Sequence, residues 1–194
     1  MRTPPLLAPL VAVLVVVTAT ASTAAAHPGH GDEMVRPLAT EAAVRARVES
    51  EVRDLVDAKK IDAAWSKVPL KQLGRVSRGG ASQWLALFEN PKAKTDRELF
   101  LFTNVYGDIV EGGFAMDEAA ALARAKTEIE RLVAIKKLAP SWQPPSSPKL
   151  EKRAVGSSWE WVAVVDNAKD VEHPRLWIFL KPYGDFVAAN HTGT

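Results

Sequence analysis

Two closely spaced histidines near the N-terminus are the residues of this sequence best suited to bind a metal ion. They stand in the segment His27-Pro28-Gly29-His30. If the chain is cut after Ala26, His27 becomes the first residue, and its amine and imidazole form a chelate suited to Cu(II). The second imidazole, three residues later, adds a third nitrogen. The sequence therefore predicts a site for copper or a similar divalent transition metal at His27 and His30.

The chain has four histidines, and the other two are His173 and His191. His191 is a weaker candidate for a further metal ligand. His173 directly precedes Pro174 in an expected turn, and we interpret it as an ordinary surface residue. The alternative for His27 and His30 is a polar tail whose imidazoles bind metal ions only adventitiously.

The sequence contains none of the catalytic motifs that can be recognised from residue spacing. It has no cysteine, no Gly-x-Ser-x-Gly, no His-Glu-x-x-His and no glycine-rich phosphate loop. Asp108 and Asp185 occupy matching positions, but each follows Tyr-Gly, where aspartate serves the backbone of a turn. The sequence therefore predicts a protein that is not an enzyme.

The first 26 residues have the composition of an export signal. Arg2 precedes an uncharged apolar run over residues 6–17, and small residues lead to Ala24-Ala25-Ala26. We expect cleavage near Ala26, a location in the periplasm or outside the cell, and no membrane span afterwards. The alternative is an uncleaved anchor, because residues 6–26 are about long enough to cross a bilayer.

The composition of the remainder limits its partners and its means of stabilisation. The chain has 25 Lys and Arg against 23 Asp and Glu, so removing Arg2 leaves it nearly neutral. A basic surface for nucleic acid is therefore not expected. Without cysteine there is no disulfide, so a packed core must stabilise the fold.

An internal duplication organises the chain after residue 39. Shifting the sequence by 77 positions aligns residues 40–116 with 117–193 without a gap, and 23 of the 77 pairs are identical. Two tryptophans and a Tyr-Gly-Asp triplet recur in register. The predicted domains are a signal peptide (1–26), a tail containing histidines (27–39), and two repeats (40–116 and 117–194).

Each repeat is predicted to be a helix followed by a three- or four-stranded antiparallel meander, which is an α+β fold. Thr40 and Asp117 are the expected N-caps. The paired lysines 59–60 and 136–137 are expected in the last helical turn, where positive charge suits the helix dipole. The apolar period then changes from 3.6 to two. Strands are expected over residues 83–89, 98–104, 159–165 and 175–181, with weaker ones at 71–76 and 149–155.

The predicted strands are apolar on both faces, whereas one helix covers only one face of a sheet. We therefore expect the two repeats to pack together with pseudo-two-fold symmetry. Trp65 and Trp142 follow the helices and are expected to close the helix ends against the sheets. Trp159 has Ser82 as its counterpart in the first repeat. It is our candidate for a tryptophan that marks a ligand groove.

The ending Gly184-Asp185-Phe186-Val187-Ala188-Ala189-Asn190-His191-Thr192-Gly193 resembles that of an uncharacterised family of exported bacterial proteins. A single unit of that family has a start rich in histidine, a helix, a tryptophan in a loop, two core strands and an Asn-x-Thr-Gly ending. The first repeat departs from this ending. The order of elements also resembles that of PepSY-type domains, which implies binding or restraint of partners. Neither resemblance implies a catalytic residue.

Three functions are compatible with these features. The favoured hypothesis is a non-catalytic exported module of PepSY-like type that binds a protein or peptide in the cell envelope. The second is a periplasmic protein that handles copper or a similar ion through His27 and His30. The third is an enzyme with an unrecognised site. The sequence leaves the oligomeric state open.

Overall fold

Two consecutive units of the same architecture make up the protein in the computed structural model, which describes residues 36–156 and 158–194. Each unit has one α-helix, one short 3-10 helix and a four-stranded antiparallel sheet with its strands in chain order. This confirms the α+β fold and the tandem repeat. The first contains α1 (Glu41–Asp57), η1 (Ala63–Lys67), β1 (Leu70–Arg78), β2 (Ala81–Glu89), β3 (Glu98–Thr103) and β4 (Ile109–Phe114). The second contains α2 (Glu118–Ala134), η2 (Pro140–Trp142), β5 (Lys149–Val155), β6 (Ser158–Asp166), β7 (Arg175–Leu180) and β8 (Phe186–Asn190).

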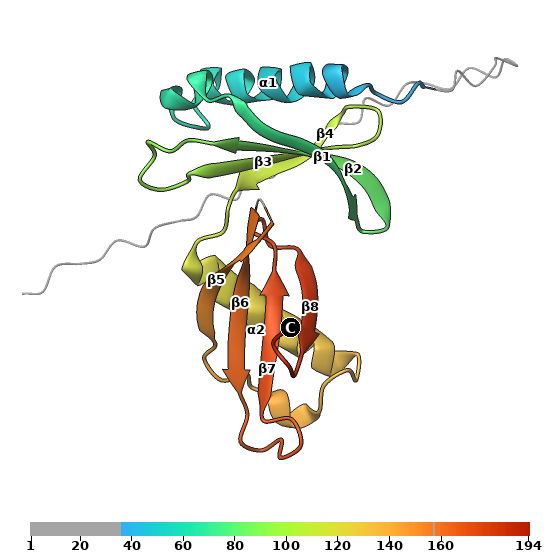
Figure 1. Cartoon of the computed structure of the whole chain (residues 1–194), viewed down its shortest axis with the longest axis vertical. Coiled ribbons are helices and arrows are strands. Elements are labelled where there is room, and N and C mark those ends of the chain that lie inside the picture. Colours follow the sequence, from blue (N-terminus) through green and yellow to red (C-terminus); the bar gives the residue numbers. More distant parts are fainter. Residues whose placement is uncertain (1–35, 157) are drawn as a thin grey trace, which may run out of the picture. The chain divides into compact units, whose positions relative to one another are not determined.

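Both helices begin at the predicted N-caps. The side chain of Thr40 accepts a hydrogen bond from the Ala43 amide at 3.2 Å, and that of Asp117 accepts one from Ala120 at 2.8 Å. Each bond satisfies a backbone donor that lacks a partner within the helix. The buried helix positions recur every four residues or nearly so, which places one apolar face of each helix on its sheet (Figure 1).

The paired lysines do not lie in the last helical turn, so that prediction was wrong. Lys59 and Lys136 follow the helix ends and adopt a left-handed backbone, with φ of 57° and 60°. The amides of Lys59 and Lys60 donate to the carbonyls of Val56 and Leu55, both at 2.9 Å, and the second repeat shows the same pattern. This is a Schellman ending, in which glycine normally takes the left-handed position. The lysines therefore terminate the helices through their backbone.

The sheets contain the two strands that the sequence indicated only weakly, as β1 and β5. Trp65 and Trp142 lie in the 3-10 helices between helix and sheet, and each is 2% exposed. This confirms that they close the helix ends. In the second repeat, buried residues of α2 and η2 pack against alternate residues of the two central strands, β6 and β7. These strand residues are Trp161, Ala163 and Val165 of β6 and Leu176, Ile178 and Leu180 of β7.

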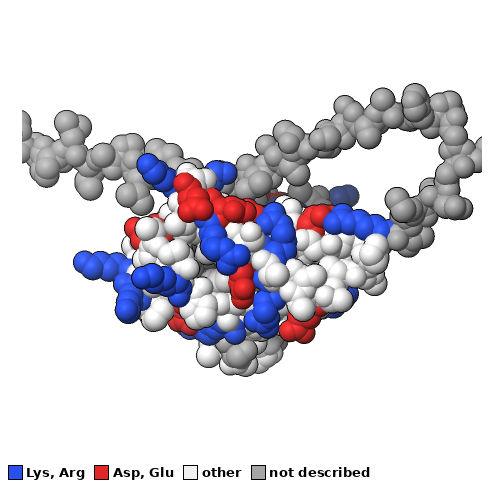
Figure 2. Space-filling model, turned by 90° about the horizontal axis from the view of Figure 1, so that it is seen from above, with Lys and Arg blue, Asp and Glu red and all other residues white. Residues whose placement is uncertain are grey.

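Charged side chains of both signs are mixed over the face shown in Figure 2, without a continuous basic area. Mixed charge of this kind is typical of a solvated protein surface. Within the described residues, neither helix has the length and apolar character that crossing a membrane requires.

Candidate functional site

The first predicted metal ligands, His27 and His30, lie outside the described residues. Their role stays a prediction. The other two histidines of the chain are described, and both lie in the second repeat.

The C-terminal turn, residues 190–194, holds His191 in a defined position after β8. Asn190 Oδ1 accepts hydrogen bonds from the amides of Thr192 and Gly193, at 3.1 and 2.8 Å. Its Nδ2 donates to the Thr194 carbonyl at 2.7 Å. A side chain on Gly193 would meet the Trp177 ring at 2.9 Å. The turn therefore requires Asn190 and Gly193 for its own geometry. The side chain of His191 takes no part in forming the turn.

The His191 ring is oriented by one backbone group. Its Nδ1 lies 2.8 Å from the carbonyl oxygen of Arg175. Because a carbonyl only accepts hydrogen bonds, this contact assigns the proton to Nδ1. The neutral ring then carries its lone pair on Nε2. A ring nitrogen tied to a backbone carbonyl while the other nitrogen remains available is the usual arrangement of histidines that bind metals.

His173 lies beside His191, although the two are 18 residues apart in sequence. Their ring centroids are 4.4 Å apart, and the ring planes are tilted by 34°. His173 belongs to the β6–β7 loop, residues 167–174. The sequence alone predicts an ordinary surface residue at this position. The structure therefore adds a second imidazole to the one predicted at His191.

Asp170 holds the β6–β7 loop to the core. Its Oδ1 accepts a hydrogen bond from the His173 amide at 3.0 Å, and its Oδ2 accepts one from Nε1 of the buried Trp142 at 2.9 Å. The bond from Trp142, followed by that from the His173 amide, lowers the pKa of Asp170. Asp170 is therefore an ionised anchor that positions the backbone of His173.

The two imidazoles open onto a surface cleft of about 470 Å³, which we call the histidine cleft. Trp177 forms part of its wall, and the Arg175 guanidinium at its edge is paired with Asp166 at 2.6 Å. Within residues 36–156 and 158–194, no three or more His, Asp and Glu side chains are arranged around a common metal position. The cleft thus offers two imidazoles and leaves other coordination positions to water or a second ligand. Its lining is Asp166, Ala168, Glu172, His173, Pro174, Arg175, Trp177 and His191.

Trp159, the sequence candidate for a ligand groove, packs at the margin of the core. Its ring meets that of Trp161 edge to face with centroids 5.2 Å apart, and the Lys152 ammonium lies 4.3 Å from its centroid. The histidine cleft is instead lined by Trp177, another tryptophan without a tryptophan counterpart in the first repeat.

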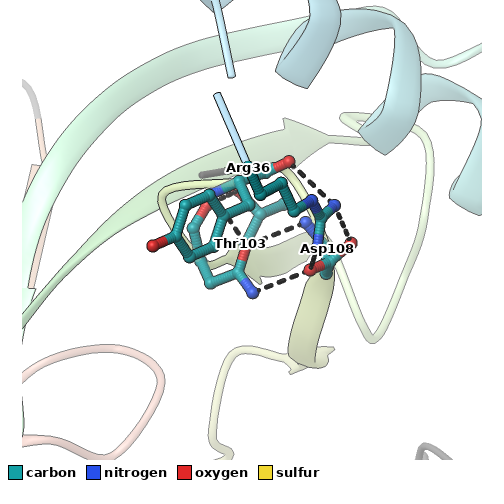
Figure 3. Close-up of polar contacts among 5 residues, drawn as sticks. Arg36, Thr103 and Asp108 are labelled. Atoms are coloured by element: carbon teal, nitrogen blue, oxygen red, sulfur yellow. Dashed lines mark hydrogen bonds and ion pairs between the residues drawn. The ribbon is translucent and has the colours of Figure 1, made fainter. Parts of the chain in front are cut away.

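A second polar cluster surrounds the Tyr-Gly-Asp turn of the first repeat (Figure 3). Arg36 donates to both carboxylate oxygens of Asp108, at 2.5 and 2.6 Å, and Asn104 donates to the same carboxylate at 2.9 Å. The Arg36 bond, and then that from Asn104, lowers the pKa of Asp108 from 3.8 to about 2. A carboxylate held ionised in this way fastens the turn and is poorly suited to exchange protons near neutral pH.

Replacing Asp108 with asparagine should reduce the free energy of unfolding by about 0.5–1 kcal/mol at pH 7, because the ion pair is largely exposed. The folded-state pKa is depressed, so the carboxylate stabilises the fold above about pH 4 and this contribution disappears as pH falls through about 2. Urea unfolding of both proteins between pH 2 and 7 measures the difference. The double variant with Asp108→Asn and Arg36→Gln should lose little more free energy of unfolding than either single variant. If the two losses add in full, the side chains do not stabilise the fold as a pair.

The family comparison accounts for the whole chain. A model described as a family of unknown function (DUF6488) matches residues 1–116 and, separately, residues 111–194. The chain belongs to this family. The assignment confirms the resemblance to an uncharacterised family. No curated protein and no solved structure matches the chain.

The two DUF6488 copies differ at the histidine cleft. Positions equivalent to His173 and His191 are Asp96 and Phe114 in the first copy, and the equivalent of Asn190 is Gly113. The first copy therefore has neither imidazole, nor the asparagine that builds the C-terminal turn. Any chemistry of the histidine pair belongs to the second DUF6488 copy alone.

Proposed function

We propose that this protein is a non-catalytic exported protein that binds a divalent transition metal, copper or a similar ion, in the cell envelope. The observation that carries the proposal is the orientation of His191. Its Nδ1 is tied to a backbone carbonyl, its Nε2 carries the lone pair, and a second imidazole lies 4.4 Å away in an open cleft. The predicted site at His27 and His30 would serve the same function.

The β5 edge of the second sheet supports a peptide partner less well. Strand addition needs an exposed edge that presents its backbone to an extended chain. The edge strand β5 is almost wholly exposed, but it carries Lys149, Glu151, Lys152 and Arg153. Charges at this density are the usual protection of an edge against pairing with another chain. The edge strands β4 and β8 carry few charges, so the metal-binding hypothesis takes precedence because of the histidine pair and not because strand addition is blocked at every edge.

A calorimetric Cu²⁺ titration of the protein beginning at His27 tests the proposal, with the N-terminus verified by mass spectrometry. We expect at least one equivalent to bind with a dissociation constant of about 1 μM or tighter. The control is a variant with all four histidines changed to alanine, which should not bind in this range. Equal binding by the control, or no binding by the parent, would refute a histidine-based metal function.

A further inference from the structure

We infer that His173 and His191 together form a two-imidazole site for a divalent late transition metal, with Cu²⁺ bound most tightly. This inference rests on the proposed function and assigns it to the second repeat. Imidazole is a preferred ligand of copper, nickel and zinc, and affinity for such sites rises along the series to Cu²⁺. The pair joins two segments that are distant in sequence, the β6–β7 loop and the C-terminal turn.

The separation of the two rings suits a shared ion. Imidazole nitrogens bind zinc at about 2.0–2.1 Å, so two of them on one such ion lie roughly 3–4 Å apart. The ring centroids are 4.4 Å apart with a 34° tilt, so rotation of the side chains can direct one nitrogen of each ring toward a shared ion. His173 is exposed, whereas the His191 ring is held by the Arg175 carbonyl.

The backbone around both ligands is fixed by contacts that do not use the imidazoles. Asp170 binds the His173 amide and is itself bound by Trp142, and Asn190 closes the turn around His191. These residues position the ligands without belonging to the site. Preformed positions reduce the conformational entropy that is lost when a metal binds.

The charge in the cleft does not oppose a cation. Arg175 is the guanidinium nearest to the site in sequence, and its Nε is paired with the Asp166 carboxylate while its Cζ lies 5.7 Å from the Trp177 ring centroid. Glu172 lines the same cleft and adds a negative charge. The local balance therefore favours a divalent ion over an anion.

Two protein ligands leave a four-coordinate ion with open positions. Structural metal sites are usually closed by four protein ligands, whereas open positions admit water or an incoming ligand. The histidine cleft is thus suited to an ion that is exchanged, such as one passed to another carrier. It is not suited to an ion that locks the fold.

The test uses a His27→Ala, His30→Ala background, in which His173 and His191 are the only histidines left. This double variant should still bind one equivalent of Cu²⁺ by calorimetry, and its electron paramagnetic resonance spectrum should show coupling to two imidazole nitrogens. Adding His173→Ala or His191→Ala should weaken binding about 10-fold or more and remove one nitrogen coupling. Lys169→Ala, an exposed change in the same loop, should leave both measurements unchanged.

The outcomes separate this inference from the proposed function. If the parent binds Cu²⁺ and the His27→Ala, His30→Ala variant does not, the function stands and the cleft site is refuted. If neither binds, both fail. Binding that is unaffected by His173→Ala also refutes the cleft site. Because His173 is exposed on a loop, that variant decides the matter even if His191→Ala disturbs the C-terminal turn.

Discussion

Replacing Trp142 with alanine should lower the free energy of unfolding by about 3–5 kcal/mol. The indole is 2% exposed and fills the space between α2 and the sheet of the second repeat. Its removal leaves a cavity in the core. It also leaves Asp170 without the hydrogen bond that anchors the β6–β7 loop. Urea unfolding followed by circular dichroism measures the loss.

A matched pair of phenylalanine variants separates the hydrogen bond of Trp142 from its packing. Trp142→Phe removes the donor to Asp170, whereas Trp161→Phe removes a buried indole N–H that has no acceptor in the described structure. Both changes shorten a buried indole in the same core. We expect Trp142→Phe to lower the free energy of unfolding by about 1 kcal/mol more than Trp161→Phe does. Equal costs would show that the bond to Asp170 contributes nothing to stability.

The features predicted correctly are those that depend on local sequence. Thr40 and Asp117 act as caps because a side-chain oxygen before a helix reaches its first amides, whatever the rest of the chain does. The central strands follow from apolar alternation. The equivalence of Trp65 and Trp142 placed both between helix and sheet, because duplicated residues occupy equivalent positions.

The helix ends were harder to predict, because their termination does not follow from residue type. The left-handed position that ends such a helix is normally glycine, and here it is Lys59 or Lys136. Lysine there gives no sign of a positive φ. The positive charge of the lysines therefore predicted that they lie in the last helical turn, whereas their backbone geometry places them after the helix end.

The histidine pair depends on tertiary structure, so residue spacing could not reveal it. The hairpin of β7 and β8 pairs Trp177 with Asn190, which brings His191 close to Arg175. Counting outward from the Tyr-Gly-Asp turn would have placed this pairing one residue off, because the register shifts between Phe179 and Leu180. The position of His173 depends further on the β6–β7 loop and on Asp170, and the sequence carries no sign of these contacts.

Replacing Gly193 with alanine should disturb the C-terminal turn more than a comparable change elsewhere in the second repeat. Gly193 has φ of 78°, and an added Cβ would meet the Trp177 ring at 2.9–3.3 Å. Gly156 has φ of 58° with nothing within 4 Å, so Gly156→Ala measures the left-handed backbone alone, about 1–2 kcal/mol. Because of the additional collision, Gly193→Ala should lower the free energy of unfolding by about 1–3 kcal/mol more than Gly156→Ala, unless the turn detaches from Trp177.

If the C-terminal turn detaches from Trp177, the collision is relieved and the free energy of global unfolding falls by less. Amide hydrogen exchange at residues 190–194 is therefore the more direct measurement. We expect these amides to lose protection in Gly193→Ala and to keep it in Gly156→Ala. Because the turn positions His191, Gly193→Ala should also weaken Cu²⁺ binding about 10-fold in the His27→Ala, His30→Ala background. Unchanged exchange and affinity would mean that the turn does not depend on the approach of Gly193 to Trp177. An increase in exchange without a loss of affinity would show that the metal site does not depend on the turn, and that the Arg175 carbonyl and the Trp142 ring suffice to hold His191.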